Sequence, residues 1–170
     1  VDWNVITEQK FITLNFVGQI NAINKAQAVI EFQPDGTIIT ANDNFLQTMG
    51  YTLEEIKGKH HSMFVETAYR NSPEYVLFWE SLRQNNFQQN EFKRLAKGGR
   101  EVWIRATYNP IADMKNQVYK VVKYATDITQ LKHAQLENEM GMEESVKVLK
   151  AVSAGDLTQK MLQEYKGTFG

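Results

Sequence analysis

The sequence contains no cysteine, which excludes disulfide bonds, thiolate metal ligands, a cysteine nucleophile and flavin–cysteine photochemistry. An excess of charge is also lacking, because 19 Lys and Arg residues nearly balance 20 Asp and Glu residues and leave a net charge of −1. On electrostatic grounds, neither nucleic acid nor an anionic membrane is therefore an expected partner.

Long apolar runs and catalytic signatures are missing as well. No apolar segment approaches the roughly 20 residues needed to cross a bilayer, and the N-terminus has no charged segment leading into an apolar one. The chain also has no nucleophile elbow, no phosphate-cradling glycine loop and no HExxH zinc motif. We therefore expect a cytoplasmic protein that is not an enzyme and makes no membrane contact within these 170 residues.

Residues 30–52 organise the chain. They predict two short strands around the turn Pro34-Asp35-Gly36, and then a helix that is capped within residues 42–44 and ends at Gly50. The distant segment KVVKYATDIT, residues 120–129, predicts a buried strand with a polar exit. Between these two segments the chain must close one small sheet.

The intervening residues predict helices first and strands afterwards. Thr52 and Glu55 form a capping box, and Ser72-Pro73 opens a helix whose buried side carries Tyr75, Phe78, Trp79 and Leu82. Residues 87–95 and 101–108 alternate as a hairpin, and residues 118–125 pair next. This order of elements indicates an α+β fold.

Helical patterns flank the sheet on both sides. Before it, apolar residues fall at Phe11, Leu14, Val17, Ile20 and Ile23, on a helix that either covers the domain's own sheet or forms a dimer. After it, residues 131–152 are again helical. Residues 5–10 also parallel residues 127–132, either by chance or as the tail of a preceding module of the same kind.

Residues 22–130 resemble one complete PAS domain. The matches, in order, are the Pro-Asp-Gly turn, Ala41-Asn42 before Phe45, Gly50-Tyr51, Gly58, Trp79, Lys97-Gly98-Gly99, Trp103-Ile104, Asn109-Pro110-Ile111 and Asp127-Ile128-Thr129. The resemblance implies a five-stranded antiparallel sheet with a helical belt on one face. Residues 1–21 are then an N-terminal linker helix, and residues 131–170 a signalling helix.

Two longer runs narrow the resemblance. GYTLEEIKGKHHSMF and FKRLAKGGREVWIRATYNPI are similar to the sensory PAS modules of methyl-accepting chemotaxis and aerotaxis transducers, and VLKAVSAGDL, residues 148–157, resembles the end of a HAMP-type helix entering a transducer stalk. The resemblance implies a homodimer that senses oxygen, redox state or a small ligand. Its exit helix then controls a histidine kinase through an adaptor. The alternative is a cofactor-free PAS module for dimerisation and relay.

A cofactor site is predicted around two histidines of the helical belt. By the resemblance, His61 in preference to His60 ligates haem b iron or contacts FAD, although Val65 replaces an arginine of the flavin-binding relatives. Trp79 lines the pocket or belongs to the core, and Trp103 and Tyr124 are candidate distal groups. The alternative is that the histidines are packing or surface residues that hold no cofactor. No other metal site is expected.

Signal relay is assigned by the resemblance to the end of the last strand. Asp127 and Thr129 lie at this junction, and Asp127 is expected to pair with Lys97 or Arg100 near the central hairpin. The alternative is that Asp127 simply caps the exit helix.

Overall fold

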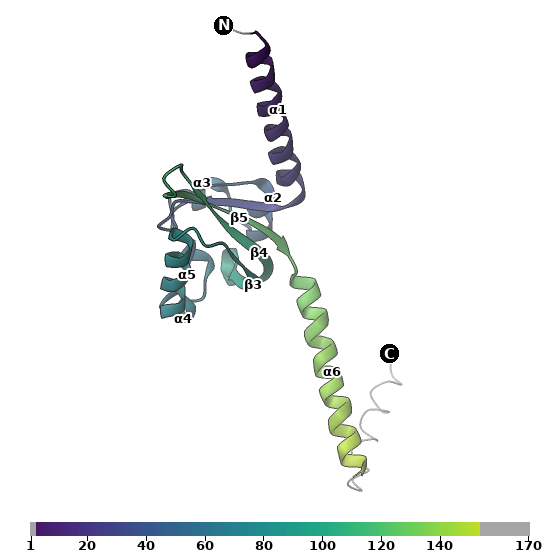
Figure 1. The fold of residues 1–170 in the computed structure, drawn as a ribbon. Coiled ribbons are helices and arrows are strands. Elements are labelled where there is room, and N and C mark those ends of the chain that lie inside the picture. The colour runs from purple at the N-terminus through teal and green to yellow at the C-terminus, as the bar shows by residue number, and fades with distance from the viewer. Residues whose placement is uncertain (1–2, 154–170) are drawn as a thin grey trace. The chain divides into compact units, whose positions relative to one another are not determined.

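The computed structural model describes residues 3–153, with side chains described from Thr7 onward. The chain consists of two compact units, residues 1–128 and 129–170. The first contains a five-stranded sheet and its helices, whereas the described part of the second is one long helix (Figure 1).

All neighbouring strands of the sheet are antiparallel. The strands are β1 (Ala28–Phe32), β2 (Ile38–Ala41), β3 (Gln88–Leu95), β4 (Glu101–Ala112) and β5 (Val118–Asp127). Their order across the sheet is β2-β1-β5-β4-β3, so the last strand of the chain lies at its centre (Figure 1). This confirms the predicted five-stranded antiparallel sheet and the hairpin at residues 97–100.

Short helices lie between β2 and β3, and a long helix lies on either side of the sheet in the sequence. The first unit contains α1 (Trp3–Ala26), α2 (Asp43–Met49), α3 (Leu53–Ile56), the 3-10 helix η1 (His61–Phe64), α4 (Thr67–Arg70), α5 (Pro73–Arg83) and the 3-10 helix η2 (Lys97–Gly99). The second unit contains α6 (Thr129–Ser153). The predicted HAMP-like segment, residues 148–157, lies partly outside the described residues.

Asn42 joins three elements. Its Oδ1 accepts hydrogen bonds from the backbone N–H groups of Phe45 (3.0 Å) and Val29 (2.9 Å), so the residue caps α2 and holds β1. Its Nδ2 donates to the carbonyls of Asn24 (3.0 Å) and Gln27 (2.8 Å) at the end of α1. One amide therefore fixes the place where α1, β1 and α2 meet.

The other predicted caps are confirmed. Thr52 and Glu55 make the reciprocal bonds of a capping box at α3. Ser72 caps α5, and Pro73 occupies the first turn, where a missing N–H is tolerated. These caps fix the orientation of the short helices that carry the belt side chains.

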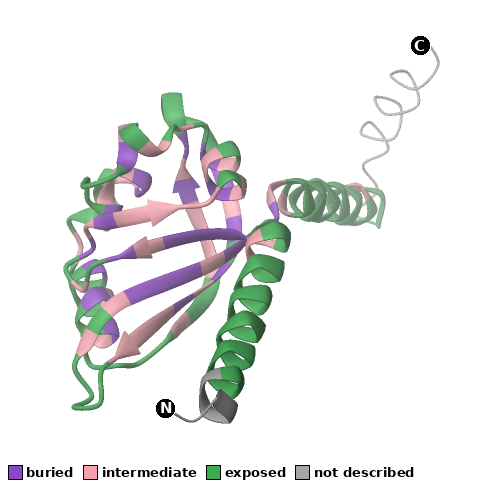
Figure 2. Cartoon of the chain, turned by 90° about the horizontal axis from the view of Figure 1, so that it is seen from above, coloured by how far each residue is buried: buried purple, intermediate pink, exposed green. Residues whose placement is uncertain are grey.

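The core lies between one face of the sheet and the belt. Along β4, Val102, Ile104, Ala106 and Tyr108 are buried at alternate positions, as the period of a half-buried strand requires. Burial is concentrated in the strands and in parts of the short helices, whereas α1 is exposed along most of its length (Figure 2).

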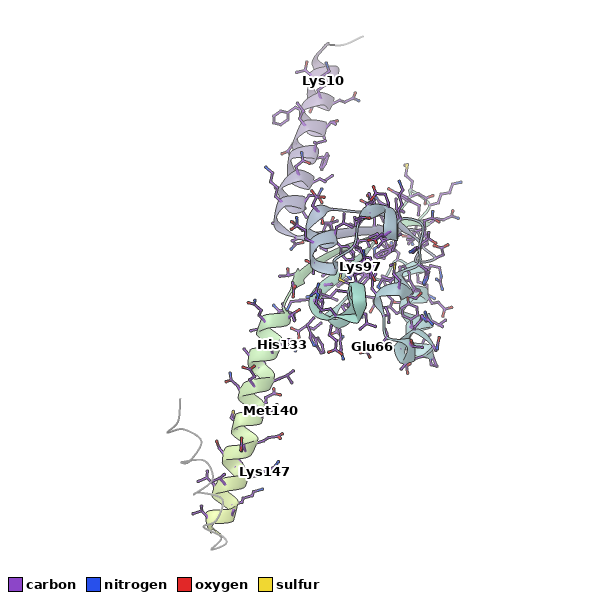
Figure 3. All side chains as sticks on the ribbon, turned by 180° about the vertical axis from the view of Figure 1, so that it is seen from behind. Lys10, Glu66, Lys97, His133, Met140 and Lys147 are labelled. Carbon is purple, nitrogen blue, oxygen red and sulfur yellow. The ribbon has the colours of Figure 1, made fainter. Side chains whose placement is uncertain are left out.

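The long helices carry exposed apolar side chains. On α1, Phe11 is 72% and Leu14 70% exposed, and on α6, Met140 is 69% and Leu149 68% exposed. Figure 3 shows how side chains such as Met140 stand out around the axis of α6. Within residues 3–153 no helix is both long and apolar enough to span a membrane.

Candidate functional site

His61 is the centre of a polar cluster inside the first unit. It opens η1 and is fully buried. Its Nδ1 lies 2.8 Å from the hydroxyl of Tyr75 on α5, and its Nε2 lies 3.0 Å from the hydroxyl of Tyr108 on β4. The imidazole therefore links the belt to the sheet through both ring nitrogens.

The proton on this chain of hydrogen bonds can take two positions. A neutral imidazole carries one N–H, so one phenol donates to it and the other accepts from it. Burial, opposed by the indole N–H of Trp79, raises the pKa of Tyr75 to about 12. Burial also acts to raise the pKa of Tyr108, but the charges of Arg94 and Lys123 outweigh it and lower that pKa. Of the two phenols bonded to His61, that of Tyr108 therefore loses its proton more easily than that of Tyr75.

Two cations supply that charge from within the core. Arg94 on β3 is 3% exposed and Lys123 on β5 is 1% exposed. Nη2 of Arg94 donates to the hydroxyl of Tyr108 (3.3 Å), and Nη1 donates to the carbonyl of Lys93 (2.8 Å). The Lys123 ammonium interacts with the phenol of Tyr108 and lies 4.9 Å from its ring centroid. Both cations therefore converge on one oxygen.

No carboxylate shares this interior. Among the described residues the buried polar or charged side chains are His61, Arg94 and Lys123, with no Asp or Glu. Burial lowers the pKa of Lys123 to about 8, and the charge of Arg94 acts in the same direction against the attraction of Tyr108. Burial, with help from both cations, also lowers the pKa of His61 well below its usual value, so the imidazole is neutral at physiological pH. The cluster is cationic.

Aromatic rings enclose the cluster. The imidazole of His61 has the ring centroids of Phe32 and Trp79 at 5.4 Å. Phe78 and Phe92 pack against Tyr108, with ring centroids at 4.9 and 5.5 Å. The polar groups thus sit in a low-dielectric shell, where their mutual interactions are strong.

His60 has a different role from His61. It is exposed, its Nδ1 accepts from the N–H of Ser62 (3.1 Å), and its Nε2 lies 2.8 Å from the carbonyl of Asp35. Since Nδ1 accepts, Nε2 carries the proton and donates. Gly36 in the turn has φ +91°, and a Cβ there would lie 2.5 Å from Nε2 of His60. His60 therefore fastens the β1–β2 turn to the belt.

The remaining predicted cofactor residues are divided between the two faces of the sheet. Trp79 is 4% exposed and contacts His61, as predicted for a pocket or core residue. Trp103 and Tyr124 are half-buried on the opposite face, because they alternate with the inward-facing Ile104 and Lys123. The structure therefore does not bring Trp103 or Tyr124 together with His61.

The predicted relay residues lie at two places. Lys97 forms an ion pair with Glu55 (2.5 Å), and Nη2 of Arg100 donates to the carbonyl of Thr48 (2.8 Å). Asp127 ends β5 opposite Ile104, and Thr129 begins α6. The pairing of Asp127 with either cation stays a prediction.

Haem b and FAD do not fit this arrangement. A haem ligand needs a free imidazole nitrogen, whereas both nitrogens of His61 are engaged by phenols. A planar cofactor also needs a slot, but the rings of Phe32, Trp79 and Tyr108 lie with centroids 5.4 to 5.7 Å from that of His61. The cluster is built to hold protons and charge in a packed core.

Four residues of the cluster, Tyr75 on α5 and three residues of the strands, were not predicted as site residues from the sequence. Arg94, Tyr108 and Lys123 each occupy an inward-facing strand position; Lys123, for example, stands between the buried Val121 and Ala125. A charged residue in the apolar phase of a strand is the signal that identifies Arg94 and Lys123.

Comparison with protein families agrees with the geometry. A family model described as the PAS fold matches residues 38–125, just over half of the chain. Light-oxygen-voltage domains are among the similar solved structures; one has a TM-score of 0.57 at 20% identity and covers 74% of this chain and 96% of its own. A PAS domain from Colwellia psychrerythraea has a TM-score of 0.59 at 20% identity, with coverages of 68% and 98%. At these identities the structures support the fold alone.

The curated relatives include one biofilm dispersion protein and two proteins that are sensory by name. The biofilm dispersion protein BdlA of Pseudomonas aeruginosa is 40% identical over 111 residues, which cover 65% of this chain and 27% of that protein. The aerotaxis receptor of Escherichia coli is 32% identical over 74 residues, with coverages of 44% and 14%. The oxygen sensor protein DosP of Escherichia coli is 26% identical over 138 residues, with coverages of 76% and 16%. The chain thus spans about a quarter of these relatives' length or less.

Proposed function

The chain belongs to the PAS family, and from this premise we propose that it is the sensory input module of a chemotaxis-type signal transducer. The observation that carries the proposal is the position of β5. This central strand contributes Lys123 to the buried cluster and ends at Asp127, two residues before α6 begins at Thr129. A change of charge or packing in the cluster therefore acts on the strand that leads into the exit helix.

One relative supports the chemotaxis assignment by its name. The aerotaxis receptor matches this chain at 32% identity over 74 residues. We propose that α6 continues into a stalk that controls a histidine kinase through an adaptor, and that the module acts in the cytoplasm without catalysing a reaction. The described residues carry a cationic, aromatic interior suited to sensing and no metal-ligand group of three or more.

Self-association is the second part of the proposal. The apolar residues of α1 at positions 11, 14, 17, 20 and 23 are between 38% and 72% exposed. Large exposed apolar stripes on long helices favour a helical partner, and a second copy of this chain supplies one. This also supports the alternative of a cofactor-free module for dimerisation and relay.

A kinase assay tests the main proposal. In complexes of the full transducer with adaptor and kinase, Tyr108→Phe removes the oxygen on which the cluster converges, and we expect kinase activity to change at least threefold. Tyr119→Phe, on the neighbouring strand β5 at a position 58% exposed, is the matched control and leaves activity unchanged. Equal activity of wild type and Tyr108→Phe, with both proteins folded, contradicts the proposal.

An absorption spectrum tests whether the module holds haem or flavin. We expect freshly purified protein to be colourless from about 300 to 700 nm before and after dithionite, because both nitrogens of His61 are engaged. A Soret band or flavin bands would instead require the cluster to open around a bound cofactor.

A further inference from the structure

A surface groove lies beside the cationic cluster, on the side of α5 and β3. Its volume is about 380 Å³, and its lining includes Tyr69, Glu74, Leu77, Phe78, Asn90 and Phe92. Phe78 and Phe92 are also the rings that cover Tyr108, at 4.9 and 5.5 Å. The inner wall of the groove is thus the outer wall of the cluster.

Arg94 lies directly behind that wall. The centre of its guanidinium is 4.6 Å from the ring centroid of Phe92, two residues earlier on the same face of β3. The groove residue Tyr69 is also near, because the charge of Arg94 opposes the effect of burial on the Tyr69 pKa. The half-buried ring of Phe92 therefore stands between the groove and the guanidinium, so a ligand in the groove would reach Arg94 when this ring moved aside.

The guanidinium has capacity for a further acceptor. Its Nη1 and Nη2 are used by Lys93 and Tyr108, but its Nε is buried without a hydrogen-bond partner. A buried donor without an acceptor is unfavourable, and a buried cation without an anion is more so. Among the described residues no buried carboxylate offers that acceptor.

We propose that this groove binds a small carboxylate with a planar apolar body, and that Arg94 receives the carboxylate. The proposal rests on the sensory function above and names its ligand class. Arginine is the side chain that matches a carboxylate through parallel N–H donors. Leu77, Phe78 and Phe92 give the apolar body its walls, whereas a compact inorganic anion leaves those walls uncovered.

Binding links to relay through shared residues. A carboxylate on Arg94 competes with Tyr108 for the guanidinium, and Tyr108 also contacts Lys123 on β5. Occupancy of the groove therefore changes the hydrogen bonding of the strand that precedes α6.

Calorimetric titration with benzoate and benzamide tests the ligand class. The two molecules have the same shape, and only benzoate carries the charge. We expect benzoate to bind one site per chain at least tenfold more tightly than benzamide, and more tightly than inorganic phosphate. Arg94→Lys keeps the positive charge but loses the pair of parallel N–H donors, and we expect it to weaken benzoate binding at least tenfold. Arg105→Gln, which alters an exposed arginine paired with Glu91, does not.

A second readout keeps the test independent of mutant folding. The N–H resonance of Arg94 Nε in the wild-type chain shifts when benzoate binds, because that hydrogen gains an acceptor. The proposal is overturned if benzoate fails to bind, if benzamide or phosphate binds as tightly, or if this resonance does not move. If benzoate does not bind but Tyr108→Phe changes kinase activity, the ligand class is rejected and the sensory function stands. If benzoate binds but Tyr108→Phe leaves kinase activity unchanged, the sensory function is rejected and the ligand class stands.

Discussion

Nε2 of His61 lies 3.0 Å from the hydroxyl of Tyr108, which joins the helical belt to the sheet through a fully buried hydrogen bond. Replacing His61 by Ala leaves the phenols of Tyr75 and Tyr108 without this partner and opens space between three rings. We expect a loss of about 3 kcal/mol in the free energy of unfolding, measured by urea titration. His133→Ala, at an exposed position of α6, is the control. Equal losses in the two variants contradict a structural role for the His61 bridge.

The stability of the domain is expected to rise with pH above neutrality. The pKa of Lys123 is about 8 in the folded protein, against 10.5 as its ordinary value. Between these values the unfolded chain binds more protons than the folded one, so the free energy of unfolding increases with pH. The lowered pKa of Tyr108 acts in the same direction. From pH 7.5 to 9.5 we expect a gain of about 2 kcal/mol.

Lys123→Met removes this dependence. The variant has no buried ammonium, so its stability is nearly flat across the same range, and it is more stable than wild type at pH 7. Lys120→Met, which breaks the ion pair with Glu31 (3.0 Å), keeps the rise with pH. A rise of the same size in Lys123→Met assigns the effect to another group and refutes this account of the cluster.

The turn at Gly36 is expected to tolerate no side chain. Gly36 has φ +91°, and a Cβ meets His60 Nε2 at 2.5 Å and Trp79 at 3.0 Å. We expect Gly36→Ala to lower the free energy of unfolding by about 2 kcal/mol or more, measured by chemical denaturation. Gly18→Ala on α1 meets nothing within 4 Å, and it is expected to leave stability unchanged or raise it slightly. If both variants behave alike, the close approach of His60 is unimportant.

The long helices are expected to form a dimer. Sedimentation of the wild-type chain at micromolar concentration should give twice the monomer mass, and Leu14→Glu combined with Leu149→Glu should shift it toward monomer. Both leucines are about 70% exposed. Val76→Glu, at a position 60% exposed on α5, is the control for an added charge. A wild-type monomer well above micromolar concentration refutes the dimer.

Local signals in the sequence predict most of the fold. Caps at Asn42, Thr52 and Ser72 and the turn at Gly36 act through neighbouring residues, so their patterns are readable without tertiary information. The central position of β5 depends on pairing with residues far away in the chain, which local patterns do not reveal. The linker helix was predicted for residues 1–21, whereas α1 runs from Trp3 to Ala26, since an apolar stripe marks a helix face better than the helix ends.

The site was only partly predictable. The sequence indicates His61 but not which groups meet its nitrogens, because Tyr75 and Tyr108 are 14 and 47 residues away along the chain. Trp103 and Tyr124 have the right chemistry for a distal group, yet strand alternation directs them to the other face of the sheet. Arg94 and Lys123 have the polarity of surface residues, and only their phase within the strands indicates burial.

The central claim is that the buried cluster acts on β5 and the start of α6. Hydrogen exchange measures this directly, by comparing wild type with Tyr108→Phe at the backbone amides of residues 118–131. We predict exchange at least tenfold faster along β5 and in the first turn of α6 in the variant, with little change in β2, at the far edge of the sheet. Unchanged exchange at residues 118–131, in a variant that is otherwise folded, would show that the cluster stabilises the core without reaching the exit helix.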